Sequence, residues 1–164
     1  GGFFGAAAHH DVVLDVFFGV DYHSHLGTKC AGMIFHDAEE GCFQREIHSI
    51  ENTPFRTKFE DDIVRFHGTS AIGCISDATR SRCRALAFGH LRYHDHRCHQ
   101  QCRGLVEEYF EDHDAQFMAL SSGAVNSTEL VAALINQKDD LVSGILHAPI
   151  EDDGSLTLLI MTED

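Results

Sequence analysis

The chain has 164 residues, enough for one domain, and its 43% apolar and 23% charged residues are typical of a globular protein with its own core. Its formal charge is −14, from 26 acidic and 12 basic residues, which disfavours a surface for nucleic acid or for an anionic membrane. No apolar run is long enough to span a membrane, and no signal-peptide pattern opens the chain. We therefore expect a cytoplasmic protein whose six cysteines are reduced.

Hydrophobic periodicity predicts a strand-rich first half. In chain order, the pattern favours a buried strand in residues 1–8, a helix capped by Asp11 and ending near Tyr22, a hairpin of strands 31–36 and 42–47 around a turn at 39–41, a loop with a short helix in 49–69, and a buried strand at 71–75. Cys30, Cys42 and Cys74 fall in or beside these strands, where a buried and inert thiol is the usual outcome.

In the second half, helices are predicted between strands. We expect a helix at 105–110, a strand at 117–120, and then a helix that opens on the capping box Asn126–Glu129 and places Leu130, Val131, Leu134 and Ile135 on one face. A second helix over 139–147 and an apolar strand over 156–161 close the chain. This order of elements predicts a layered α+β fold that forms a single domain over residues 1–164.

One stretch, residues 80–103, differs from the rest in composition. It holds six of the nine arginines with one acidic residue, Asp95, and it is rich in cysteine and histidine. Zinc-ligand side chains gather there, so a zinc-binding module is one interpretation. The paired Cys-x-x-Cys units of most structural zinc sites are missing, and the flanking arginines would repel a cation. The residues in question are His94, His96, Cys98, His99 and Cys102.

Several short motifs together match a known pattern: the opening Gly1-Gly2-Phe3-Phe4-Gly5, then His25-Leu26-Gly27, then Ala31-Gly32-Met33. Over nearly the whole chain the sequence resembles the class II glutamine amidotransferase domain that forms the N-terminal half of the amidophosphoribosyltransferase family. That family opens Cys-Gly-Ile-Phe-Gly and continues with His-Arg-Gly, Ser-Ala-Gly and Ile-Gly-His, the last of these at Ile72-Gly73-Cys74. Residues 126–130 fall where it has Ser-Asp-Thr-Glu-Val, and a divergent branch that opens Gly-Gly-Phe-Phe-Gly is more similar still, above all over 21–28 and 128–135.

The resemblance implies a four-layer αββα sandwich of the N-terminal-nucleophile hydrolase type, truncated at its C-terminus in this chain. It also implies a degenerate glutamine pocket. The family's nucleophile is an N-terminal cysteine, whose position here is Gly1, and the arginine of its His-Arg-Gly turn is replaced by Leu26, between His25 and Gly27. The histidine of Ile-Gly-His becomes Cys74, the arginine that binds the substrate carboxylate falls near Ser76, and the aspartate that holds the substrate amino group becomes Ser127.

From this resemblance we expect a glutaminase-like domain of an amidophosphoribosyltransferase-like protein, a family of purine nucleotide biosynthesis, that no longer hydrolyses glutamine and uses no cofactor or metal. An active glutamine amidotransferase whose nucleophile precedes Gly1 is the alternative. The expected partners are a glutamine-like small molecule or none, a C-terminal phosphoribosyltransferase-type domain that this chain lacks, and further copies of the full-length protein.

The unusual composition between residues 78 and 104 has an explanation in the genetic code. The family has β-strands here, whereas residues 93–102 carry almost no apolar side chain. Joining the last two bases of each codon to the first base of the next permits Leu-Gly-Thr-Tyr-Ala over residues 88–92 and Ile-Thr-Thr-Ile-Gly-Ala-Ile-Asn-Asn over 93–101. Such an alternating, β-branched segment is typical of a strand. We expect residues from about 78 to 104 to be translated out of frame.

Overall fold

The computed structural model describes residues 1–37, 39, 41–77, 127–147 and 158–162. Its elements are β1 (Gly2–Ala7), α1 (Val13–Tyr22), a 3-10 turn η1 (Ser24–Leu26), β2 (Cys30–Asp37), β3 (Cys42–Ser49), α2 (Phe55–Phe59), β4 (Ser70–Ser76), α5 (Ser127–Ile135) and α6 (Leu141–His147). The sequence predicts each strand and the helices α1, α5 and α6 to within a few residues, and α2 only as a short helix within residues 49–69. The predicted helix at 105–110, the strand at 117–120 and the stretch 80–103 lie outside the described residues.

In the part of the chain that the structure describes, four strands form one antiparallel sheet in the order β1-β4-β2-β3. The predicted hairpin is β2 and β3, which pair from Cys30 with Ser49 to Asp37 with Cys42. Gly41, in the turn between them, has φ 62, a conformation that glycine adopts without strain. The central strands β4 and β2 are buried along nearly their whole length, so both faces of the sheet are covered.

Alternate side chains of the central strands enter two separate cores, as the two-residue period of a strand requires. On one face, Met33, Phe35, Ala71 and Ile75 pack against α1. On the other face, Ile34, Ile72 and Cys74 form a second apolar cluster. A strand that is apolar on both sides belongs in the middle of a layered structure.

Helix α1 covers the first face because its apolar stripe faces the sheet. Val13, Val16 and Val20 are buried there. The cap position is Val12, one residue after the predicted Asp11, although Asp11 Oδ1 accepts a hydrogen bond of 3.0 Å from the Val13 amide. Gly73 of β4 makes the close approach possible, because a Cβ at this position would collide with Val20.

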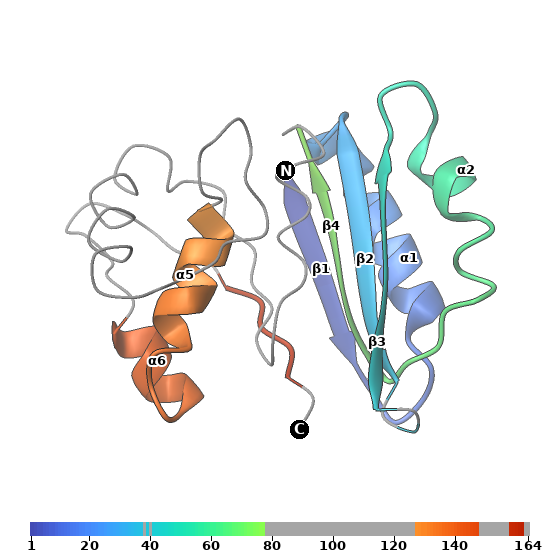
Figure 1. The fold of residues 1–164 in the computed structure, drawn as a ribbon. Helices are drawn as coiled ribbons and strands as arrows, with labels where there is room; N and C mark the ends of the chain where they lie inside the picture. The colour runs from blue at the N-terminus through green and yellow to red at the C-terminus, as the bar shows by residue number, and fades with distance from the viewer. Residues whose placement is uncertain (38, 40, 78–126, 148–157, 163–164) are drawn as a thin grey trace.

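Residues 158–162 lie between the sheet and α5 (Figure 1). Leu159 and Met161 pack on the second face of the sheet, whereas Leu158 and Ile160 pack against α5. The prediction of a strand over 156–161 is wrong for the part described, because residues 158–161 are not in a strand. Apolar side chains follow one another in this segment because successive residues contact two apolar layers in turn, the sheet and α5.

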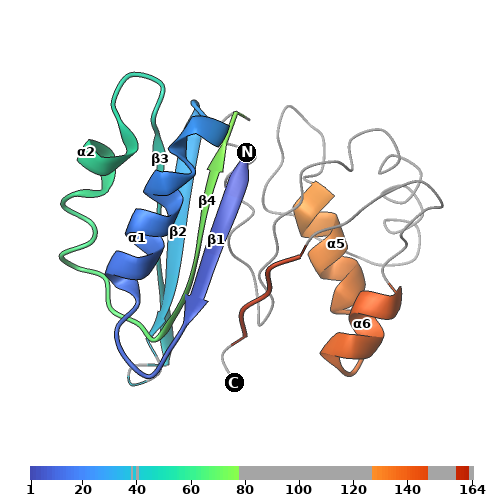
Figure 2. The same cartoon turned by 180° about the vertical axis from the view of Figure 1, so that it is seen from behind.

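The described residues therefore form a mixed α/β fold with one antiparallel sheet and helices on both of its faces, α1 and α2 on one side and α5 and α6 on the other (Figure 2). The second sheet of the expected four-layer sandwich is not among these residues. None of the described helices has the length and apolar character needed to cross a membrane. The end of the sheet where β1 begins and β4 ends carries most of the predicted site.

Candidate functional site

Four of the seven predicted pocket residues meet where β1 begins and β4 ends. Gly2 pairs with Ile75, which places Gly1 at the level of Ser76. The turn η1 follows α1 directly and contacts both α1 and β4, so it brings Leu26 to the same place. Three segments far apart in the sequence thus converge on one end of the sheet.

Gly27 makes the closest contact at this end. A Cβ on Gly27 would lie 2.5 Å from the backbone nitrogen of Ser76 and 2.8 Å from its Cα. The φ of Gly27 is −163°, an extended value open to any residue, so glycine is required here for space. The loop backbone therefore lies directly on the end of β4, and Ser76 beneath it is buried.

Leu26 fills the adjoining position with an apolar side chain. Its Cδ1 would lie 3.0 Å from a Cβ placed on Gly2, so the leucine rests on the first residue of β1. A leucine cannot donate a hydrogen bond, and this position therefore supplies packing where the resemblance would place a guanidinium.

The contact between Thr28 and Asp77 is one that sequence reasoning missed. Asp77 Oδ1 accepts hydrogen bonds from the backbone nitrogen of Thr28 at 2.9 Å and from its Oγ1 at 3.0 Å. These bonds hold the pKa of the Asp77 carboxyl below its ordinary value, and the backbone bond has the larger effect. The two residues are 49 positions apart, so no local sequence signal could have paired them.

The other predicted pocket residues are not shown to join this group. His25 is exposed, and its Nδ1 lies 3.2 Å from the backbone oxygen of Tyr22 in its own turn. Ser127 is the first residue of α5, and its place in a pocket stays a prediction. Cys74 is two residues from Ser76, but it belongs to the apolar cluster formed with Ile34 and Ile72.

The burial of Cys74 decides its chemistry. Its side chain is fully buried, and loss of solvation raises the pKa of the thiol to about 12, an effect opposed by a backbone hydrogen bond involving Gly32. The thiolate, which is the nucleophilic form, is then almost absent at neutral pH. The prediction of an inert buried thiol is therefore confirmed for Cys74.

Alkylation tests this assignment. At pH 8, about one Cys74 thiol in ten thousand is ionised, so iodoacetamide is expected to leave Cys74 unmodified in the native protein. Cys42, a half-buried cysteine outside any disulfide, serves as the internal comparison and should react first. Both should react after denaturation. Peptide mass spectrometry measures the two rates, and native labelling of Cys74 as fast as that of Cys42 would contradict the assignment.

Cys30 departs from the prediction of reduced cysteines. It is fully buried and disulfide-bonded, so it is not a free thiol. That prediction depended on the missing signal peptide, which does not report on the surroundings of an individual cysteine.

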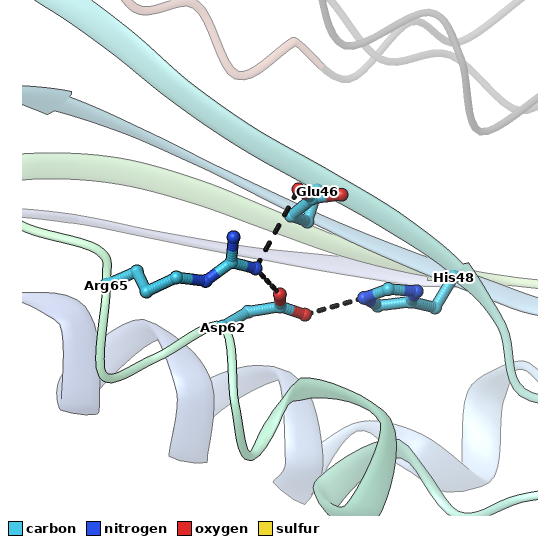
Figure 3. A network of polar contacts seen from close by, with 4 residues as sticks. All are labelled: Glu46, His48, Asp62 and Arg65. Carbon is cyan, nitrogen blue, oxygen red and sulfur yellow. Dashed lines mark hydrogen bonds and ion pairs between the residues drawn. The ribbon is translucent and has the colours of Figure 1, made fainter.

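A second polar group lies along the edge strand β3 (Figure 3). Asp62 is buried, and its carboxylate is bonded to Nε2 of His48 at 2.6 Å and to the guanidinium of Arg65. Arg65 also lies 4.0 Å from Glu46. The His48 ring packs edge-on against Phe59, with 4.6 Å between the ring centroids. These side chains join β3 to the segment that follows α2, so their role is to hold this part of the fold together.

The zinc-binding alternative cannot be placed on this structure. Its residues lie outside the described part of the chain, namely His94, His96, Cys98, His99 and Cys102. Within the part of the chain that is described, no three histidine, cysteine or acidic side chains are grouped so as to hold a metal ion.

Comparison with solved structures identifies two proteins of similar fold. One is the glutamine phosphoribosylpyrophosphate amidotransferase from B. subtilis, complexed with ADP and GMP, and the other is described as the allosteric regulatory enzyme of purine biosynthesis. For each, the TM-score is 0.73 and the identity is 20% over 98% of this chain, which spans 35% of the other chain's length. No protein-family model and no curated protein matches the chain. The fold relationship expected from the sequence is thus confirmed.

Proposed function

We propose that this chain is a glutaminase-type domain of an amidophosphoribosyltransferase-like protein and that it has lost glutamine hydrolysis. The observation that carries the proposal is the convergence of Gly1, Leu26, Gly27 and Ser76 at one end of a sheet that shares its fold with such enzymes. Gly1, which the resemblance matches to the family's nucleophile, has no side chain that could attack.

The loss follows from the chemistry that glutamine hydrolysis needs. An N-terminal nucleophile attacks through its side-chain thiol or hydroxyl while its amine accepts the proton. Gly1 has neither a thiol nor a hydroxyl. Glutamine is also a zwitterion, which is held best by charge-assisted hydrogen bonds to its carboxylate and its amino group. Leu26 has no side-chain donor or acceptor, and Ser76 and Ser127 offer neutral hydroxyls where salt bridges to a zwitterion need charged groups.

The role that remains is structural or regulatory within a longer protein. We propose the four-layer sandwich as the complete domain, with a phosphoribosyltransferase-type domain and further copies of the protein as its partners. A place in purine nucleotide biosynthesis, and a glutamine-like ligand for the altered pocket, rest on the fold similarity and on the sequence resemblance.

Glutamine hydrolysis by the full-length protein tests the proposal. Ammonia release, followed through coupled glutamate dehydrogenase, is expected to stay at the background rate. Gly1→Cys at the N-terminus is expected to leave it there, because the carboxylate and amino group of glutamine still have no charged partner. A matched variant adds Leu26→Arg, Ser76→Arg and Ser127→Asp, and hydrolysis is expected to reappear in it. Robust hydrolysis by the unmodified protein would overturn the proposal.

We also propose that residues from about 78 to 104 are translated out of frame. The support is their composition, together with the strand pattern that the shifted codons permit. The coding DNA settles the matter, since this proposal requires compensating insertions or deletions on both sides of the stretch when close relatives are aligned.

A further inference from the structure

The loop of residues 24–28 is attached to the strand ends at three successive positions. Leu26 rests on Gly2, Gly27 lies on the backbone of Ser76, and Thr28 is bonded to Asp77. The next residue, Lys29, donates its amide to the backbone oxygen of Ser76 at 3.1 Å. The loop is therefore closed over the end of the sheet where Gly1 and Ser76 lie side by side.

The attachment at Asp77 differs from the other two. Leu26 and Gly27 are held by packing, whereas Asp77 acts through two hydrogen bonds from an exposed carboxylate. The two bonds favour the ionised carboxylate and hold the pKa of Asp77 below its ordinary value. Because the side chain is exposed, its removal leaves no cavity in the core.

We propose that Asp77 is a positioning residue that latches the loop 24–28 closed, so that entry of a small molecule to Ser76 requires the Thr28–Asp77 contact to open. This inference rests on the proposed function, which identifies this end of the sheet as the former glutamine site. It adds a regulatory element, because any ligand of the altered pocket must compete with a contact that the chain makes with itself.

Amide hydrogen exchange measures the latch directly. In Asp77→Ala, exchange at the Thr28 amide is expected to rise severalfold, and Asp77→Asn should restore much of the protection, since its oxygen still accepts the bond. Asp140→Ala is the matched control, because Asp140 accepts the same two kinds of bond from Ser143. That control should leave Thr28 unchanged. Equal exchange at Thr28 in the unmodified protein and in Asp77→Ala would overturn the proposal.

A labelling experiment measures access to the site independently of glutamine. Ser76→Cys places a thiol at the buried position under the loop, and its modification by iodoacetamide is followed by peptide mass spectrometry. Labelling is expected to be severalfold faster when Asp77→Ala is added and unchanged when Asp140→Ala is added. Equal rates in all three proteins would show that Asp77 does not control access. Neither measurement depends on catalysis. The latch proposal can therefore be contradicted while the proposed function stands, and the proposed function can be contradicted while the latch proposal stands.

Discussion

Replacing His48 by alanine is expected to destabilise the protein by about 2–3 kcal/mol. The substitution removes the Nε2 that lies 2.6 Å from Asp62 and leaves that carboxylate buried, with only 6% of its side chain exposed. Removing one partner of a buried charge usually costs about 3–5 kcal/mol, and the loss should be smaller here because Arg65 remains bonded to Asp62. Chemical denaturation at neutral pH measures the change.

His67→Ala is the matched control. His67 also has an aspartate neighbour, Asp11, but the two atoms are 4.0 Å apart and the side chains are 68% and 51% exposed. An exposed pair of this kind contributes little, so His67→Ala is expected to change the stability by less than about 0.5 kcal/mol. If both variants lost the same free energy of unfolding, the burial of Asp62 would not strengthen its contact with His48.

Gly27→Ala is expected to cost about 3 kcal/mol, or to push the loop off the end of β4. The new methyl group would lie 2.5 Å from the nitrogen of Ser76, and backbone atoms in a paired strand cannot move aside cheaply. Because the φ of Gly27 suits any residue, the penalty comes from the lack of space. Denaturation gives the loss of stability, and faster exchange of the Thr28 amide would show displacement of the loop.

Gly5→Ala separates this effect from the general cost of replacing a glycine. A Cβ at Gly5 would also meet an atom at 2.5 Å, but that atom is the tip of the flexible Leu159 side chain. The leucine can rotate, so the loss is expected to stay below about 1 kcal/mol. If Gly27→Ala were as stable as Gly5→Ala, the loop would not be pressed against β4.

The fold and the proposed chemistry depend on different residues. The sheet is held by apolar side chains such as Phe35 and Ile72, which alternate between its two faces. Glutamine hydrolysis would depend on a few groups at the strand ends, above all at Gly1 and Leu26. A chain can therefore keep the first set and change the second, so the proposed loss of hydrolysis is compatible with a TM-score of 0.73.

Much of the fold could be predicted because its signals are local. The alternation over residues 31–36 and the glycine at the following turn predicted the β2–β3 hairpin, and Asp11 marked the start of α1. The site was predicted less completely. Resemblance pointed to Leu26, Gly27 and Ser76, which the structure brings together, and also to Cys74, which lies apart from them in the apolar cluster of the second face.

By itself, the sequence determined the strands, α1 and the absence of a nucleophilic side chain at Gly1, because these follow from the residue and its near neighbours. Only the tertiary structure decided the strand order β1-β4-β2-β3, the burial of Asp62 between His48 and Arg65, and the contact of Thr28 with Asp77. Long-range pairing depends on which surfaces meet when the layers pack. Residues 49 positions apart carry no mutual signal until packing places them within hydrogen-bond distance.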